Sequence, residues 1–170
     1  MNDENPYAAP EADVRVDANP TGELASRGAR FVGAFVDGLA MFAVMIPILL
    51  MTGFFATALE GDGSVGSGIT EALAIFAFSV VVFLLINGYP LAKRGQTVGK
   101  MVAKTRIVSI KDGKILSLGS VVGLRYVPVW VISQIPLVGA LFGLIDSLFV
   151  FRDDRRCIHD LIAGTRVVTA

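Results

Sequence analysis

Arg30 and Asp37 are the first residues of this sequence that could do chemistry, because both interrupt a stretch that is otherwise mostly apolar. Because the two residues are seven positions apart, they lie on nearly the same face of a helix, about 10 Å from each other along its axis. A carboxylate inside an apolar span costs roughly 2.5 kcal/mol or more unless it meets a partner, a proton or water. Asp37 is therefore expected to face protein, either as a hydrogen-bonded staple between helices or as a group that relays a proton or an ion.

Two further polar side chains, Asn87 and Asp146, lie in apolar segments. Together with Asp37 they suffice to line a small polar cavity through which an ion or a proton passes. They are equally few enough to satisfy one another as structural contacts. Arg125 is a candidate counter-charge for Asp37 or Asp146, or a residue that marks the cytoplasmic end of its own helix.

Two short motifs resemble ligand-binding or catalytic signatures but lack parts of them. The segment Gly95-Gln96-Thr97-Val98-Gly99-Lys100 has three residues between its glycines and a methionine after its lysine. A phosphate-binding loop needs four residues there and a serine or threonine after the lysine. Cys157 and His159 are too few ligands for a zinc site, and no nucleophile motif accompanies them. The sequence predicts a tight connector at 95–100 and predicts no catalytic residue, metal site or cofactor.

Composition places these residues in a membrane protein. Hydrophobic residues make up 54% of the 170 and charged residues 18%, with 15 basic side chains balancing 15 acidic ones. The uncharged stretches 38–59 and 72–92 each match the roughly 20 residues that a helix needs to cross a bilayer. We predict two transmembrane helices, at about 27–58 and 69–92, with the lipid bilayer as their partner. A water-soluble enzyme and a nucleic-acid partner are excluded.

The distribution of charge along the chain predicts its orientation. The segment between the two helices lacks Lys and Arg, whereas a basic loop follows the second helix and contains Lys93, Arg94, Lys100, Lys104 and Arg106. The positive-inside rule places this loop and the N-terminus in the cytoplasm. Residues 1–24 are rich in acidic side chains and proline and are expected to form a disordered cytoplasmic tail. The membrane domain then covers 25–170.

The remaining elements are two strand signals and one ambiguous apolar stretch. The runs flanking Lys111-Asp112-Gly113-Lys114 predict a β-hairpin over about 103–118, and 165–169 is a third strand candidate. Between them lies either a single third span or two short helices, at about 120–134 and 137–151, broken at Pro136. We favour the pair of helices, because it keeps the C-terminal arginines in the cytoplasm and brings the last strand to the hairpin. The predicted fold class is an all-α polytopic membrane protein with two full transmembrane helices, a C-terminal membrane helical hairpin and a small cytoplasmic β-hairpin.

Three blocks of the sequence, in their order and spacing, resemble the RDD family of prokaryotic integral membrane proteins over about residues 25–169. The blocks are Arg30-Phe31-Val32-Gly33-Ala34-Phe35-Val36-Asp37, the segment 95–100 with Arg106-Ile107-Val108, and Arg155-Arg156-Cys157-Ile158-His159-Asp160-Leu161-Ile162-Ala163-Gly164-Thr165. The resemblance implies that Arg30 and Asp37 are the arginine and the first aspartate for which the family is named. Asp160 fits the second aspartate best, and Asp146 is its rival. Cation/proton antiport is attributed to some members of the family.

The sequence thus predicts a bacterial cytoplasmic-membrane protein that moves a small cation or a proton past Asp37, with Asn87 and Asp146 as co-ligands. A transporter of this size is expected to be a homo-oligomer, because four short membrane segments enclose a pathway poorly. The alternative is a non-transporting scaffold or adaptor whose basic loop binds anionic lipid headgroups or a partner protein.

The spacing of Arg30 and Asp37 also predicts that the two do not bind each other directly. We expect Arg30 at the cytoplasmic interface, beside Asp160 or a lipid phosphate. Asp37 is expected deeper, beside Asn87, Asp146 or Arg125.

Overall fold

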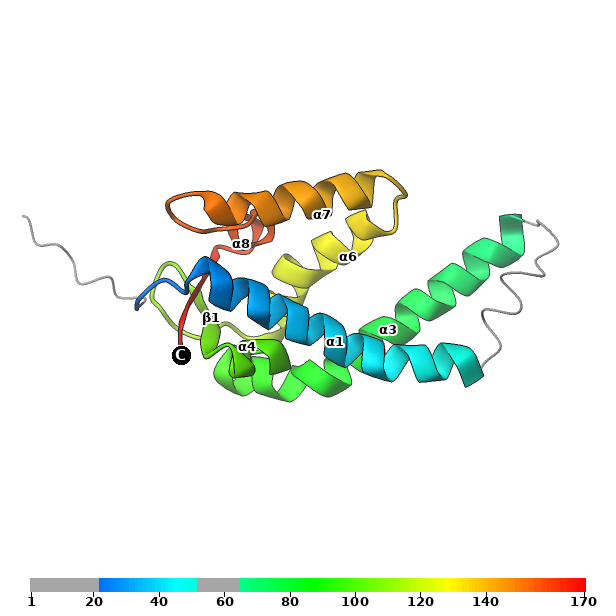
Figure 1. The fold of residues 1–170 in the computed structure, drawn as a ribbon, viewed down its shortest axis with the longest axis horizontal. Helices are drawn as coiled ribbons and strands as arrows, with labels where there is room; N and C mark the ends of the chain where they lie inside the picture. Colours follow the sequence, from blue (N-terminus) through cyan, green and yellow to red (C-terminus); the bar gives the residue numbers. More distant parts are fainter. Residues whose placement is uncertain (1–21, 52–64) are drawn as a thin grey trace, which may run out of the picture.

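Two long helices dominate the computed structural model, which describes residues 22–51 and 65–170 (Figure 1). Helix α1 covers Arg27–Met51 and helix α3 covers Val65–Arg94. Both are long and apolar enough to cross a membrane, yet only 6% of the apolar stretch of α1 and 11% of that of α3 are buried. Core helices of a water-soluble protein would be mostly buried, so this exposure suits a lipid environment. The predicted first helix extends to about residue 58, and its last part lies outside the described residues, as do residues 1–21 of the predicted tail.

The small sheet differs from the predicted β-hairpin. Strand β1, Thr105–Ser109, pairs with strand β2, Thr165–Thr169, in an antiparallel register that sets Thr105 opposite Thr169. The expected turn does form, because the Ser109 amide donates to the Lys114 carbonyl at 2.9 Å. The returning segment is not a strand, so the hairpin over 103–118 is wrong in its second half. Leu116 and Leu118 instead pack on the hydrophobic core, and the C-terminal strand pairs with β1.

The residues just before α1 belong to this folded end of the molecule rather than to a tail. Leu24 forms a β-bridge with Val168, and the Glu23 carbonyl accepts a hydrogen bond from the Thr169 amide at 2.9 Å. The Ala25 amide donates to the Val167 carbonyl at 3.1 Å. The prediction that the tail extends to residue 24 is therefore wrong for Glu23 and Leu24.

The ambiguous apolar stretch forms two short antiparallel helical arms. The first arm consists of α5, Leu118–Val121, the π-helical turn η1, Val122–Tyr126, and α6, Val127–Ser133. The second consists of α7, Val138–Leu148, and the 3₁₀ turn η2, Phe149–Phe151. A Cβ on Gly139 would lie 2.7 Å from the Ser133 Cα, so the arms pack closely at their turn. The break predicted near Pro136 is confirmed, and a single continuous span is not what forms.

The π-helical turn has a local cause in the sequence. Pro128 has no amide hydrogen, so the carbonyl of Leu124 lacks the partner that a regular helix would supply. The chain widens by one residue just before this proline, and Arg125 lies inside the widened turn. Arg125 is buried as a result, with 3% of its side chain exposed. Such turns often occur at functional sites, where they change the direction of a side chain.

Two short helices complete the fold and lie with the sheet at one end of α1 (Figure 1). They are α4, Val98–Val102, and α8, Ile158–Ile162. A compact hydrophobic core holds this end together; it consists of Ala25, Leu91, Ile107, Val121 and Val167. Every polar residue singled out from the sequence is positioned at or near this end, so the candidate site must be built there.

Candidate functional site

Asp37 binds the start of α4. Its carboxylate accepts a hydrogen bond from the Thr97 hydroxyl at 2.5 Å and another from the Gly99 amide at 2.7 Å. Asn87, from α3, accepts from the Val98 amide at 2.9 Å. The expected partners of Asp37, which were Asn87, Asp146 or Arg125, are therefore wrong. Asp37 and Asn87 do not meet each other, but both hold the same short helix.

These contacts satisfy successive amides at the start of α4. A helix leaves its first amides without intrahelical partners, and side chains commonly supply them. Here Asn87 accepts from the Val98 amide and Asp37 accepts from the Gly99 amide. The Thr97 hydroxyl accepts from the Lys100 amide at 3.3 Å. The glycine-containing segment 95–100 is thus a connector that turns into a helix pinned between α1 and α3. This geometry favours the interpretation of Asp37 as a staple.

Substitutions at Asp37 separate a staple from a relay. Asn keeps an oxygen for the Gly99 amide and an NH₂ group that can donate to the Thr97 hydroxyl, whereas Leu leaves both groups buried without partners. We expect Asp37→Asn to lower the free energy of unfolding by about 1 kcal/mol and Asp37→Leu by about 3 kcal/mol or more. Thermal unfolding of the purified protein in detergent measures both. Equal losses for the two variants would contradict the staple.

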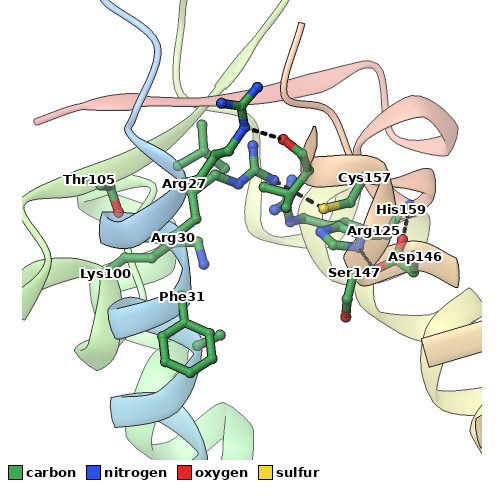
Figure 2. Close-up of a pocket in the computed structure, with 13 residues that line it drawn as sticks. Arg27, Arg30, Phe31, Lys100, Thr105, Arg125, Asp146, Ser147, Cys157 and His159 are labelled. Carbon is green, nitrogen blue, oxygen red and sulfur yellow. Dashed lines mark hydrogen bonds and ion pairs between the residues drawn. The ribbon is translucent and has the colours of Figure 1, made fainter. Parts of the chain in front are cut away.

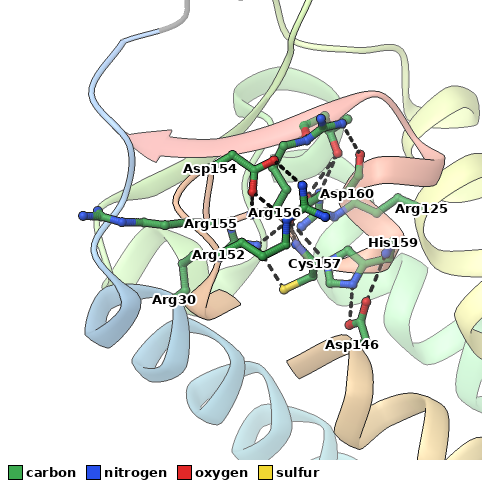
Figure 3. Close-up of polar contacts among 11 residues, drawn as sticks. Arg30, Arg125, Asp146, Arg152, Asp154, Arg155, Arg156, Cys157, His159 and Asp160 are labelled. Carbon is green, nitrogen blue, oxygen red and sulfur yellow. Dashed lines mark hydrogen bonds and ion pairs between the residues drawn. The ribbon is translucent and has the colours of Figure 1, made fainter. Parts of the chain in front are cut away.

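Asp160 is the buried centre of a second cluster of polar side chains (Figure 3). Its carboxylate forms ion pairs with Arg30 of α1 and with Arg125 of η1, while none of the Asp160 side chain is exposed. It also accepts from the Cys157 amide and the Thr165 hydroxyl, each at 3.2 Å. The predicted pairing of Arg30 with Asp160 is confirmed. Arg125 was expected beside Asp37 or Asp146, or as a marker of its helix end, and the structure places it against Asp160 instead.

The two arginines set the charge of this carboxylate. Burial alone would raise the pKa of Asp160, but Arg125 in the first place, and then His159 and Arg30, outweigh burial and hold the pKa well below its usual range. Asp160 is therefore ionised at every physiological pH. An aspartate with this environment fixes structure and does not exchange protons.

Asp146 forms a separate pair with His159. One carboxylate oxygen lies 2.6 Å from the His159 Nδ1, and the other accepts from the His159 amide at 3.0 Å. Burial lowers the pKa of His159, and Arg125 lowers it further, while the hydrogen bond with Asp146 partly opposes them. The imidazole is therefore mostly neutral at pH 7, and it gains a proton as the pH falls.

Acidification is expected to destabilise the protein through His159, the only histidine of the chain. Because its folded pKa lies below the unfolded value of about 6.5, its stabilising contribution is present above that pH and is lost as the pH falls through the folded pKa. The melting temperature should fall between pH 7.5 and 5.5. His159→Gln, which does not titrate, should flatten that dependence. An unchanged slope in His159→Gln would assign the effect to other groups.

Asp146, Cys157 and His159 also bring three potential metal-binding atoms within 4.8 Å of one another. The surroundings do not suit a divalent cation. The Arg30 guanidinium donates to the Cys157 sulfur at 3.5 Å, and burial raises the pKa of this thiol to about 11. Since a metal binds the thiolate rather than the thiol, positive charge and a protonated sulfur both oppose a cation here.

The residues of the predicted basic loop divide into two groups. Lys93, Arg94 and Lys104 are exposed, and Arg106 on β1 is half-buried. Lys100 turns inward from α4 and lines a cavity with Arg27, Arg30 and Arg125 (Figure 2). The loop is therefore a basic surface with one of its lysines directed into the protein.

Sequence reasoning missed Thr97 as a partner of Asp37, and Thr165 and Arg125 as partners of Asp160. A threonine is a preferred residue at the start of a helix, and this preference would have pointed to Thr97 as the cap of α4. The inward direction of Arg125 depends on the π-helical turn, for which Pro128 three positions later was the available clue.

Comparisons with known proteins bear on the same region. A family model described as the RDD family matches residues 24–164. The uncharacterized protein YckC of Bacillus subtilis (strain 168) is 38% identical over 94 residues, which cover 54% of this chain and 59% of that protein. The matched part thus spans less than two thirds of the length of this relative. No solved structure matches the chain.

Proposed function

Since the chain belongs to the RDD family and carries two long, exposed apolar helices, we propose that it is a multi-pass protein of the bacterial cytoplasmic membrane whose basic end binds anionic lipid headgroups. The helices α1 and α3 cross the bilayer, and the arms α5–α6 and α7 enter it as a hairpin. The folded end with the sheet, α4 and α8 lies on the cytoplasmic side, together with the N-terminus.

The pairing of β1 with β2 supports this orientation. Two strands of one sheet lie on the same side of a membrane, so the loop after α3 and the C-terminal strand share a compartment. The loop after α3 is rich in lysine and arginine, and Arg152, Arg155, Arg156 and Arg166 lie in the C-terminal segment that ends with β2. The positive-inside rule assigns both regions to the cytoplasm.

Cysteine labelling in intact cells tests the orientation. In a Cys157→Ser background, Lys111→Cys and Thr169→Cys should react with an impermeant reagent only after the membrane is permeabilised. Ser64→Cys, whose position falls between the two spans in sequence, should react from outside. External labelling at either 111 or 169 would contradict the topology.

The observation that carries the lipid proposal is the basic surface at the end of α3. Lys93 and Arg94 form the last turn of that helix, and Lys104, Lys111 and Lys114 are exposed nearby in sequence. None of these five side chains forms an ion pair with a carboxylate of the described residues. Each basic residue near an anionic bilayer contributes about 1 kcal/mol of attraction.

The binding of anionic lipid headgroups is tested by measuring how strongly phosphatidylglycerol is enriched around the purified protein. The full chain is reconstituted into nanodiscs containing phosphatidylcholine and phosphatidylglycerol, and the lipid that remains bound after mild detergent extraction is quantified. Replacing Lys93, Lys104, Lys111 and Lys114 with Gln should lower phosphatidylglycerol enrichment at least tenfold, and replacing them with Arg should preserve it. Equal enrichment in all three proteins would overturn the proposal.

Movement of a small cation or a proton is a second candidate, favoured by the titratable pair of Asp146 and His159 beside a cavity. Asp37 and Asn87 already serve the amides of α4, so their proposed role as ion ligands loses its support. A homo-oligomer would cover the exposed apolar faces of α1 and α3 and would help to enclose a pathway for the ion. Proton flux into proteoliposomes that is lost in Asp146→Asn but kept in Asp37→Asn would support this candidate. Flux equal to that of empty liposomes would refute it.

A further inference from the structure

A cavity of about 250 Å³ lies between α1, α4, η1, α7 and the segment before α8. Figure 2 shows Arg27, Arg30 and Lys100 on one side of it, and Arg125, Cys157 and His159 on the other. Pockets for drug-sized ligands are about 300–1,000 Å³. This cavity is therefore suited to a single small group.

The charge of the cavity wall is strongly positive. Among the described residues, four cationic side chains line it, whereas Asp146 is the only carboxylate in the wall. Counting Asp160, which is paired with Arg30 and Arg125 behind the wall, and Asp37, whose charge acts on Lys100, still leaves an excess of positive charge.

Two of these cations have no carboxylate partner among the described residues. Arg27 donates to the main-chain carbonyls of Val150 and Phe151, at 3.3 Å and 3.2 Å. Lys100 forms no ion pair with any carboxylate of residues 22–51 and 65–170. Burial, with Arg125 second, lowers the pKa of Lys100 to about 8, and the charges of Asp37 and Asp160 oppose this shift only in part.

A buried hydroxyl at the same cavity also lacks a partner. Thr105 on β1 lines the cavity, is 1% exposed, and its Oγ1 makes no hydrogen bond within the described part of the chain. A buried polar atom without a partner costs free energy, and such atoms are few in folded proteins. A bound group with hydrogen-bond acceptors would satisfy both the hydroxyl and the ammonium.

We propose that this cavity is a binding site for a phosphate-type oxyanion, supplied either by a phospholipid headgroup or by a soluble phosphate compound. The guanidinium groups offer the planar, paired donors that phosphate oxygens favour, and Lys100 and Thr105 offer single donors. Phe31, Ala34 and Val150 form an apolar part of the same wall, which suits the glycerol end of a lipid. In its lipid form the inference rests on the proposed function, but it concerns one enclosed group rather than the exposed basic surface.

Thermal unfolding of the purified full chain in a neutral detergent tests the site. Sodium phosphate should raise the melting temperature saturably above sodium chloride of equal ionic strength. A soluble compound is then an adequate ligand. If phosphate has no effect but phosphatidylglycerol in nanodiscs raises the melting temperature above phosphatidylcholine, the lipid is the source. No stabilisation by either would overturn the site.

Substitutions in the cavity test whether the rise in melting temperature comes from a ligand bound there. Lys100→Gln and Thr105→Val should each lower the affinity for the stabilising ligand at least tenfold. Thr169→Val is the control and should change the affinity less than twofold, because Thr169 is the exposed residue opposite Thr105 in the sheet. Thr105→Val should in addition leave the ligand-free protein equally or more stable, because it removes a hydroxyl without a partner. Equal affinity in the wild type, Lys100→Gln and Thr105→Val would overturn the assignment.

The two proposals fail in distinguishable ways. If the cavity variants change nothing while the four-lysine variant loses phosphatidylglycerol enrichment, the cavity site is wrong and the proposed function stands. If the four-lysine variant keeps its enrichment while Lys100→Gln loses saturable phosphate binding, the proposed function is wrong and the cavity site stands.

Discussion

Replacing Asp160 with asparagine is expected to lower the free energy of unfolding by about 3–5 kcal/mol, because it leaves two buried arginines without a counter-charge. Asparagine retains an oxygen for the Cys157 amide, so the loss reports charge rather than shape. Arg30 and Arg125 come from α1 and η1, and Asp160 is the carboxylate that binds both. Since folded domains are typically stable by only about 5–15 kcal/mol, this loss is a large fraction of the total and should lower the yield of correctly folded protein at 37 °C.

The yield of monodisperse protein in detergent and its melting temperature measure this effect. Asp153→Asn is the matched control, because Asp153 is exposed and lies only seven positions earlier in the chain. It should behave as the wild type does. A yield of Asp160→Asn equal to that of the control would show that the arginines find other partners.

The same cluster changes what a charge swap between Arg30 and Asp160 should do. A simple pair would recover much of its stability when both residues are exchanged. Here an arginine at position 160 would face Arg125, whose guanidinium is buried beside it. We therefore expect the double swap to recover little, even though Arg30 and Asp160 are in direct contact.

The long elements of this fold were predictable because their signals are local. Uncharged stretches long enough to span a bilayer give α1 and α3, and a proline inside an apolar stretch gives the break between α6 and α7. The sheet was only half predictable. The turn at 111–114 favours a strand on its far side, but the better partner of β1 lies at 165–169, with the closely similar sequence Thr-Arg-Val-Val-Thr.

The contacts of the candidate site were likewise predictable only in part. The spacing of Arg30 and Asp37 correctly predicted that the two residues have different partners, and the contact of Arg30 with Asp160 was among the predicted ones. The partners of Asp37 were missed because they are amides and a hydroxyl of α4, a helix too short to give a periodic signal. Long-range hydrogen bonds to main-chain atoms leave no signature in side-chain composition.

Substituting Gly99 with alanine is expected to separate α4 from α1 at the point where Asp37 binds. A Cβ at this position would lie 1.9 Å from the Gly33 carbonyl oxygen and 2.8 Å from the Asp37 Cγ. The first contact is with main chain of a long helix, which cannot move aside as a side chain does. The two helices must move apart, and that motion stretches the 2.7 Å bond between the Gly99 amide and Asp37. We expect a loss of about 3 kcal/mol, at the upper end of the range for overpacking.

Gly143→Ala in α7 is the control, because a Cβ there meets nothing within 4 Å. Alanine favours a helix over glycine, so this variant should unfold at the same or a higher temperature than the wild type. Gly99→Ala should melt several degrees lower. Combining it with Asp37→Asn separates the two causes of the loss. If steric separation has already weakened the carboxylate contact, Asp37→Asn should cost less in the Gly99→Ala background than alone. Additive losses would show that α4 keeps its contact with Asp37 after the glycine is replaced.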